Sequence, residues 1–224
     1  MTTLTTAPVA PLLDLLFAVD KAADPASDPA LAAYWGSLGA EERAELMQSR
    51  TGYTDFYARL KNLPLAVSRE TGTLLYMLAR STGASAIVEF GTSFGLSTIC
   101  LASALRDNGG GLLVTSEFEP SKVARARQHL AESGLSDLVE FREGDALETL
   151  SRDLPASVDL LLLDGAKGLY LDILALVEPY LRPGALIIAD NADHCPPYLE
   201  RVRGGNGYLS LPFSDEVELS IRLG

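Results

Sequence analysis

The residues of this sequence best suited to chemistry are acids and an amide that follow apolar runs. Asp164 follows one such run and is followed three residues later by Lys167, while Asp190 and Asn191 follow another. Oxygen ligands without His or Cys suit a hard cation such as Mg²⁺, whereas zinc favours softer ligands. If the two runs are neighbouring strands, we expect Asp164, Asp190 and Asn191 to converge on a divalent cation. Taken singly, each acid could equally end a strand or cap a helix.

Lys167 lies where its ammonium group would be close to that cation and partly withdrawn from water. Both effects lower the pKa of a lysine, so that the amine can accept a proton near neutral pH. The alternative is a solvated lysine at the start of a helix.

A glycine-rich turn follows the apolar run that contains Glu89. Gly91 and Gly95 stand four residues apart on either side of Thr92. Such glycines let the backbone turn sharply and approach a ligand, while the next helix presents its N–H groups. The spacing is not GxGxxG, so the pyrophosphate fingerprint of nicotinamide and flavin enzymes is absent. The turn suits a nucleoside without phosphates, or it is an ordinary strand–helix connection.

Two further acids stand at the ends of expected strands. Glu117 ends one strand and could accept hydrogen bonds from both hydroxyls of a ribose, although an acid at a helix start is also favourable. Asp145, followed by Ala146, could accept from an exocyclic amine, or cap the helix that follows.

The elements that must position these residues alternate along the chain. Apolar runs predict strands over 86–90, 112–116, 139–142, 158–163 and 185–189, and two further strands over 208–211 and 217–222. Helices are expected between the first five, over 96–105, 120–132, 146–152 and 168–181. This alternation predicts an α/β fold with a mostly parallel sheet that carries helices on both faces. The last two strands have no helix between them and should form an antiparallel edge.

Residues 1–60 read as a helical cover that precedes the α/β domain of residues 61–224. Pro11 is expected to open a short helix over Leu12–Val19, where its missing N–H costs nothing. The aromatic residues of this region should fill a seam or a subunit interface, or else cover an aromatic substrate; they are Tyr34, Trp35, Tyr53, Phe56 and Tyr57.

Charge and composition exclude several classes of protein. The 224 residues carry 18 Lys and Arg against 30 Asp and Glu, a net charge of −12. This balance disfavours nucleic acids and anionic membranes as partners. Two cysteines cannot form a disulfide framework, and no apolar run is long enough to span a bilayer. No basic leader precedes the first apolar stretch, so we expect a cytoplasmic protein.

These motifs, in this order, resemble those of the S-adenosylmethionine-dependent O-methyltransferases of the cation-dependent catechol and caffeoyl-CoA type. The resemblance covers about residues 60–224. It implies a Rossmann-like class I methyltransferase fold of seven strands. It also implies methyl transfer to a hydroxyl of a small, catechol-like aromatic with the help of Mg²⁺, and often a homodimer.

The resemblance assigns a role to each motif residue. Glu89, Gly91, Thr92 and Gly95 would surround the methionine part of S-adenosylmethionine, and Ser97 would meet its carboxylate. Glu117 would hold the ribose, with Asp145 and Ala146 beside the adenine. Asp164 would serve both cofactor and metal, Asp190 and Asn191 would complete the Mg²⁺ site, and Lys167 would be the general base, with Asp164 as its catalytic partner.

Other functions stay open at this point. A metal-independent methyltransferase acting on an amine, a carbon or an isolated hydroxyl would use the same cofactor motifs. A protein that binds S-adenosylmethionine without catalysis is disfavoured by the intact Lys167 and its neighbouring acids. Relatives often place an aromatic residue soon after the Asp-Asn pair, whereas this chain has Ala192-Asp193-His194-Cys195.

Overall fold

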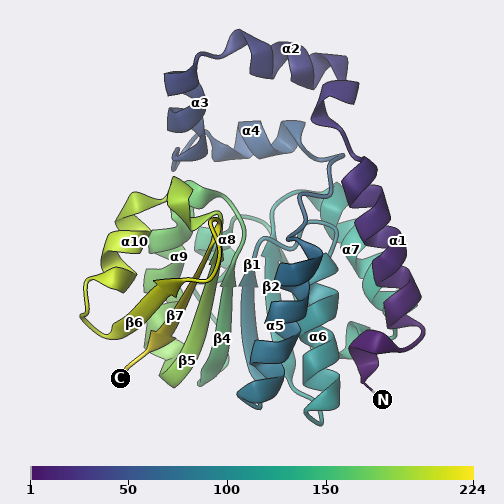
Figure 1. Ribbon diagram of the computed structural model, residues 1–224, viewed down its shortest axis with the longest axis vertical. Coiled ribbons are helices and arrows are strands. Elements are labelled where there is room, and N and C mark those ends of the chain that lie inside the picture. Colours follow the sequence, from purple (N-terminus) through teal and green to yellow (C-terminus); the bar gives the residue numbers. More distant parts are fainter. Residues whose placement is uncertain (1) are drawn as a thin grey trace.

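The computed structural model describes residues 2–224, which form one seven-stranded sheet between two layers of helices (Figure 1). The strands are β1 (Ala86–Phe90), β2 (Leu112–Glu117), β3 (Val139–Glu143), β4 (Val158–Leu163), β5 (Leu181–Asp190), β6 (Tyr208–Pro212) and β7 (Val217–Arg222). Their order in the sheet is β3-β2-β1-β4-β5-β7-β6. The first five strands are parallel, and β7 is antiparallel to both β5 and β6. The predicted α/β fold with an antiparallel C-terminal edge is therefore confirmed.

The described residues also form ten α-helices. They are α1 (Val9–Ala22), α2 (Pro29–Ser37), α3 (Ala40–Met47), α4 (Tyr53–Arg59), α5 (Arg69–Ser81), α6 (Leu96–Asp107), α7 (Pro120–Ser133), α8 (Ala146–Thr149), α9 (Tyr170–Val177) and α10 (Pro196–Arg203). No helix within residues 2–224 is both long and apolar enough to cross a bilayer.

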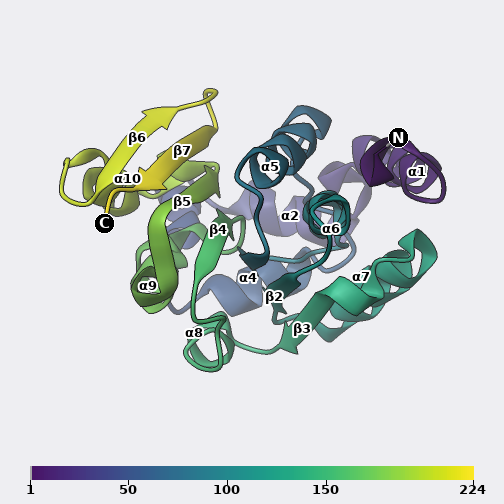
Figure 2. The same ribbon diagram turned by 90° about the horizontal axis from the view of Figure 1, so that it is seen from below.

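Helices lie against both faces of the sheet (Figure 2), and each face carries its own hydrophobic core. Helices α1, α5, α6 and α7 cover one face, and α8, α9 and α10 cover the other. Neighbouring residues of a strand point to opposite faces, so Ile87 belongs to the first core and Val88 to the second. Burial on both faces explains why β1 and β4 are uninterrupted apolar runs apart from Glu89 and Asp159.

Local sequence signals fix several helix ends. The Ser68 hydroxyl accepts a hydrogen bond from the N–H of Thr71 and caps α5. Pro120 is the first residue of α7, and Gly134 ends that helix in the left-handed conformation at φ 71°.

Three expected helix boundaries are wrong. The helix expected over 146–152 ends as α8 at Thr149. The first helix begins at Val9, so Pro11 is its third residue; the position is tolerated because the first four N–H groups of a helix lack an internal partner. The expected helix over 168–181 ends as α9 at Val177, and Leu181 already begins β5. Leu181 pairs with Val158, and the β4–β5 register then shifts across the segment that contains Pro183 and Gly184. The irregularity accommodates a proline that would otherwise interrupt a strand.

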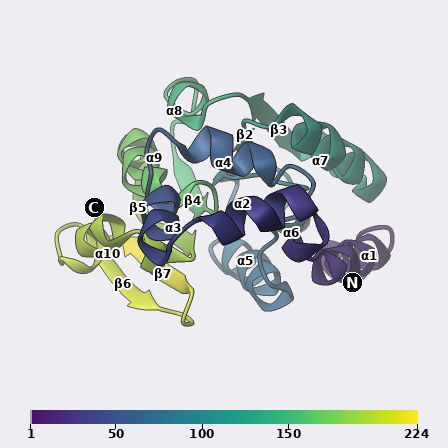
Figure 3. The ribbon, with the colours of Figure 1, turned by 90° about the horizontal axis from the view of Figure 1, so that it is seen from above.

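Helices α2, α3 and α4 form a separate lobe over the carboxyl ends of the strands (Figures 1 and 3). We call this segment the cover. Helix α1 is not part of it, because Val9, Leu13 and Leu16 are buried in the first core. Met1, the first residue of the expected 1–60 domain, lies outside the described residues. A domain boundary at residue 60 stays a prediction.

Candidate active site

Asp164 and Asp190 lie side by side at the carboxyl ends of β4 and β5. Leu163 of β4 pairs with Ala189 of β5, so the next residues of the two strands meet in the same register. Each of the two carboxyl groups is a hydrogen-bond partner of the other. The expected meeting of these two acids is present in the structure, while their service as metal ligands stays a prediction.

The two acids share a buried and electrostatically strained position. Burial, followed by repulsion from Asp164, raises the pKa of Asp190 to about 7. Burial also raises the pKa of Asp164, although the Lys167 ammonium acts in the opposite direction. Two adjacent carboxyl groups that are hard to ionise together are characteristic of a site that a cation would stabilise.

The donors at this edge fit a magnesium ion. Asn191 follows Asp190 in the left-handed conformation at φ 48°, which asparagine tolerates better than most residues. The set is two carboxylates and one amide, and Mg²⁺ typically keeps water in its remaining positions. Among residues 2–224, no cluster of three or more His, Cys, Asp and Glu side chains offers a different metal site.

Lys167 is held by two hydrogen bonds at the same edge. Its Nζ lies 3.2 Å from Oδ1 of Asp164 and 2.8 Å from the hydroxyl of Tyr170. The Tyr170 hydroxyl donates its own proton to the carbonyl of Asp190 at 2.7 Å, so it must accept from Lys167. An uncharged lysine amine can donate two hydrogen bonds and keeps one lone pair. This geometry is compatible with a general base that is fixed in position before the acceptor arrives.

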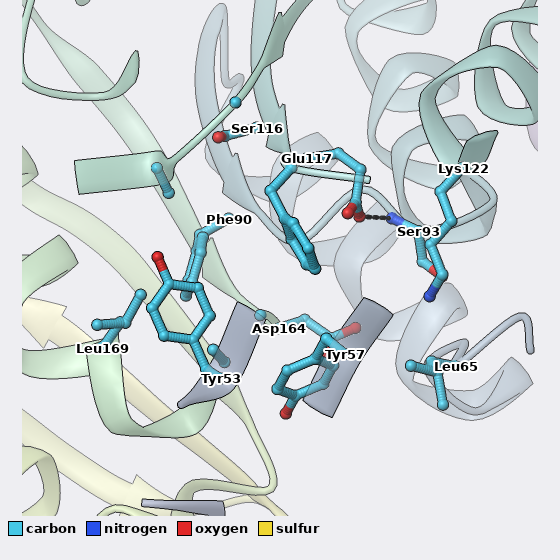
Figure 4. Close-up of a pocket in the computed structure, with 16 residues that line it drawn as sticks. Tyr53, Tyr57, Leu65, Phe90, Ser93, Ser116, Glu117, Lys122, Asp164 and Leu169 are labelled. Carbon is cyan, nitrogen blue, oxygen red and sulfur yellow. Dashed lines mark hydrogen bonds between the residues drawn. The ribbon is translucent and has the colours of Figure 1, made fainter. Parts of the chain in front are cut away.

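A cavity opens beside these residues at the carboxyl ends of β1, β2 and β4 (Figure 4). In an open α/β sheet, ligands bind at the point where the strand order reverses, here between β1 and β4. The lining residues are Tyr53, Tyr57, Leu65, Phe90, Gly91, Ser93, Ser116, Glu117, Phe118, Lys122, Gly144, Ala146, Asp164, Gly165, Ala166 and Leu169.

Gly91 is required by the close approach of two strand ends. Its φ is 100°, and a Cβ there would lie 2.5 Å from the carbonyl oxygen of Asp164. Only glycine meets both demands without moving the backbone. Gly91 therefore lets the end of β1 lie directly against the backbone of Asp164.

Glu117 lies in the centre of the cavity wall and holds the glycine turn. Its Oε2 accepts from the N–H of Ser93 at 2.9 Å, and its Oε1 accepts from the N–H of Glu119 at 3.0 Å. Glu119, rather than Glu117, caps α7. A carboxylate has about four acceptor positions, so Glu117 keeps acceptor capacity for a pair of hydroxyls.

At the other end of the cavity, Ala146 contributes to the wall and Asp145 supports it. Asp145 accepts a hydrogen bond from the N–H of Leu147 at 2.9 Å and caps α8. It also interacts with Tyr53 of the cover; burial, and then this acid, raise the pKa of Tyr53 to about 12. Asp145 is thus seen as a helix cap, and direct contact with an adenine stays a prediction.

Asp145 and four more residues expected to touch the cofactor do not line this main cavity. Glu89 is fully buried and accepts hydrogen bonds from the hydroxyls of Ser97, Thr98 and Thr115. Burial, which these hydroxyls oppose, raises the pKa of Glu89 to about 6. Gly95 faces Leu130 and Ala126 of α7. Thr92 and Ser97 border a smaller adjoining hollow, together with Ser93 and Leu65.

Sequence reasoning missed part of the wall. The cover supplies Tyr53 and Tyr57, one helical turn apart on α4, although we expected its aromatic residues chiefly in a seam or an interface. Tyr57 is hydrogen-bonded to the backbone of Lys167, and burial raises its pKa. Trp35 does behave as expected, because it stacks on Phe56 within the cover. No signal in the sequence marked Lys122, which lies on an Arg-rich helix that reads as solvent-exposed.

Comparison of the sequence with known proteins finds related methyltransferases. A family described as a methyltransferase domain matches residues 88–192. Catechol O-methyltransferase B of Danio rerio is 32% identical over 179 residues, covering 76% of this chain and 67% of that protein. Catechol O-methyltransferase of Niastella koreensis is 35% identical over 130 residues, covering 57% of this chain and 58% of that protein. The chain thus spans about three fifths to two thirds of these relatives.

Solved structures share the fold over most of the chain. The O-methyltransferase TomG of Streptomyces achromogenes, in complex with S-adenosylmethionine, is 28% identical with a TM-score of 0.63, covering 86% of this chain and 95% of that chain. An O-methyltransferase from Bacillus cereus, in complex with S-adenosylhomocysteine, is 25% identical with a TM-score of 0.63, covering 76% of this chain and 89% of that chain.

The strand order, the cavity at its switch point and these matches define a Rossmann-like methyltransferase. Within that class, the chain belongs to the S-adenosylmethionine-dependent O-methyltransferases related to catechol O-methyltransferase.

Proposed function

We propose that this protein transfers the methyl group of S-adenosylmethionine to a hydroxyl of a small, catechol-like aromatic, assisted by Mg²⁺. One observation carries the proposal: Asp164 and Asp190 meet in register beside Lys167, at the edge of a cavity that also contains Glu117. The names of the curated relatives point to the same substrate class.

The cavity fits the cofactor in the order of its groups. Ala146 and Tyr53 would flank the adenine, Glu117 would accept from the ribose hydroxyls, and Gly91 would let the methionine part lie against the backbone. The cover lies over the cavity and would exclude water once the ligands are bound, which would strengthen the polar interactions inside the site.

Lys167 would remove the proton of the attacking hydroxyl. A phenol has a pKa near 10 and is mostly protonated at neutral pH, so it is a weak nucleophile without help. Two hydrogen bonds already fix Lys167 Nζ, so its side chain loses little conformational entropy when the transition state is reached. Asp164 orients the amine, and Tyr170 links it to the backbone of the strand that carries Asp190.

Asp164, Asp190 and Asn191 would hold the magnesium ion. When bound, Mg²⁺ supplies a Lewis acid that favours the ionised form of a hydroxyl and fixes the orientation of a vicinal diol. The raised pKa values of both acids support this assignment, because a divalent cation would stabilise the doubly ionised pair.

A metal-independent methyltransferase is the second candidate. The observation that favours it is the ion pair of 3.2 Å between Lys167 and Asp164, which already gives one of the two acids a cationic partner. In that case Asp190 would stay protonated, and the acceptor would need no second oxygen.

A single assay separates the two candidates. Purified protein is freed of metal with EDTA and supplied with S-adenosylmethionine and either catechol or phenol, with and without added Mg²⁺. The proposal expects transfer to catechol that requires Mg²⁺ and little transfer to phenol. Equal rates with and without the metal would support the second candidate instead. A cytoplasmic location and a homodimer stay predictions.

A further inference from the structure

Lys122 is a buried cation in the cavity wall to which the proposed reaction gives no role. It is the third residue of α7, only 4% of its surface is exposed, and it lines the cavity. Its Nζ lies 3.1 Å from the hydroxyl of Ser93 in the glycine turn. Within residues 2–224, none of the ion pairs closer than 4.0 Å includes this ammonium group.

The surroundings of Lys122 favour an anionic ligand, because no carboxylate of the described residues lies within ion-pair distance of its ammonium group. Burial lowers the pKa of Lys122, while the more distant carboxylates of Glu117, Asp164 and Glu119 oppose that shift. The Phe94 ring, with its centroid 5.7 Å from Nζ, stabilises the ammonium group in part, but burying an ammonium group without a close counter-charge is costly. The nearest of these acids in the wall, Glu117, directs its two oxygens to backbone N–H groups of the turn and of α7.

The position of Lys122 along the cavity identifies the part of the ligand that it faces. Figure 4 shows Lys122, Ser93 and Leu65 on one side of Glu117, with Tyr53 and Leu169 on the other side. If Glu117 holds the ribose and Tyr53 lies near the adenine, the remaining side receives the methionine part. The adjoining hollow, bordered by Ser93, Thr92 and Ser97, extends the cavity on that side.

Ser97, which the family resemblance assigns to the methionine carboxylate, is engaged elsewhere in this structure. Its hydroxyl donates to Oε1 of Glu89 at 2.6 Å, so its proton points away from any carboxylate. A carboxylate bound at this end of the main cavity, where Lys122 and Ser93 line the wall, therefore needs another donor. The carboxylate is the negatively charged group of S-adenosylmethionine, because the sulfur and the amine of this cofactor both carry positive charge.

We propose that Lys122 binds the methionine carboxylate of S-adenosylmethionine, with the Ser93 hydroxyl orienting its ammonium group. This inference rests on the proposed function, since it requires that the cavity binds this cofactor. Lys122 then recognises the amino-acid end of the ligand. The ligand carboxylate in turn supplies the negative charge that the folded chain does not place within ion-pair distance of Lys122.

The test is a thermodynamic cycle that removes the Lys122 ammonium group and the ligand carboxylate, singly and together, and compares the Kd values. Isothermal titration calorimetry measures the Kd of S-adenosylmethionine and of its decarboxylated analogue for wild type and for Lys122→Gln. Wild type should bind the carboxylate-bearing ligand about 10- to 100-fold more tightly, the range of a hydrogen bond between charged groups. Lys122→Gln should lose most of this preference by weakening the first ligand and sparing the second.

Two further variants complete the design. Lys61→Gln removes an exposed lysine that approaches the same Glu119, and it should leave both Kd values unchanged. Lys122→Arg keeps the charge and should retain much of the preference.

The outcomes separate this inference from the proposed function. If wild type binds neither ligand, the proposed function fails, and the role of Lys122 fails with it. Two results would overturn the role of Lys122: wild type binds both ligands equally, or Lys122→Gln weakens both by the same factor. In either case the cavity binds the cofactor, but Lys122 only stabilises the glycine turn. Equal binding of the two ligands by wild type would overturn the inference even if Lys122→Gln does not fold.

Discussion

The strand edge and the cover contribute to the same cavity by different physical means. Asp164 and Asp190 are positioned by parallel pairing between two strands whose apolar residues are buried on both faces. The cover is built from short helices: none of the residues of α3 is buried, and α2 buries only Leu31. A position fixed by a buried sheet tolerates little change, whereas a lobe with so few buried residues can change its sequence at low cost. We infer that the edge determines the reaction and that the cover, apart from Tyr53 beside the adenine, selects the acceptor.

The largest effect should come from the strand edge. Lys167→Met removes the proposed base, and kcat should fall by about 10²- to 10⁴-fold, the usual contribution of a positioned acid or base. Affinity for S-adenosylhomocysteine, measured by calorimetry, should stay unchanged because Lys167 does not line the cavity. Lys21→Met on the exposed end of α1 is the control. A variant that keeps its kcat would remove Lys167 from the mechanism.

The second effect concerns stability beneath the same edge. Because burial raises the pKa of Glu89 from 4.5 to about 6, the native state holds more protons than the unfolded state between these values. The free energy of unfolding should therefore fall as pH rises from about 4.5 to about 6, by about 2 kcal/mol. Urea denaturation across this range measures the change.

Glu89→Gln separates the contribution of Glu89 to the free energy of unfolding from that of other groups that titrate in the same pH range. The variant should show a flatter pH dependence than wild type, and the difference between the two curves is the contribution of Glu89. Identical slopes would mean that Glu89 is not a buried, reluctantly ionised acid, and the rigidity assigned to the edge would lose support.

The third effect tests where the edge meets the cofactor. Glu117→Gln removes the charge that we assign to the ribose, and the Kd of S-adenosylhomocysteine should rise about tenfold. Glu143→Gln, at the exposed end of the neighbouring strand β3, is the matched control and should leave the Kd unchanged. Equal behaviour of the two variants would separate Glu117 from the cofactor.

The smallest effect belongs to the cover and sharpens the contrast. Tyr57→Phe removes a hydroxyl that is bonded to the backbone of Lys167, and it should change KM for the acceptor about threefold. The Kd of the cofactor should not move. Tyr34→Phe, whose ring packs against Arg59 within the same lobe, serves as the control. A cofactor defect in Tyr57→Phe, without a change in the acceptor KM, would contradict the division of labour.

The sequence was informative where one local rule decides the outcome. Apolar runs with caps, prolines and glycines predicted the alternating strands and helices of the α/β fold and placed Asp164 and Asp190 at strand ends. It was less informative where distant segments meet. Nothing in the chain near Ser97 indicates that its hydroxyl donates to Glu89, and nothing near Lys122 shows that α7 turns this lysine into the cavity. Such facts depend on packing between elements, which periodicity does not encode.

The central claim is tested most directly by a crystal structure of the protein grown with S-adenosylhomocysteine and Mn²⁺, which scatters anomalously and takes the same oxygen ligands as Mg²⁺. The account predicts one anomalous peak within coordination distance of Asp164, Asp190 and Asn191, with the sulfur of the bound ligand beside it in the cavity. A ligand that occupies the cavity while the metal is absent from these three side chains, or lies elsewhere, would contradict it.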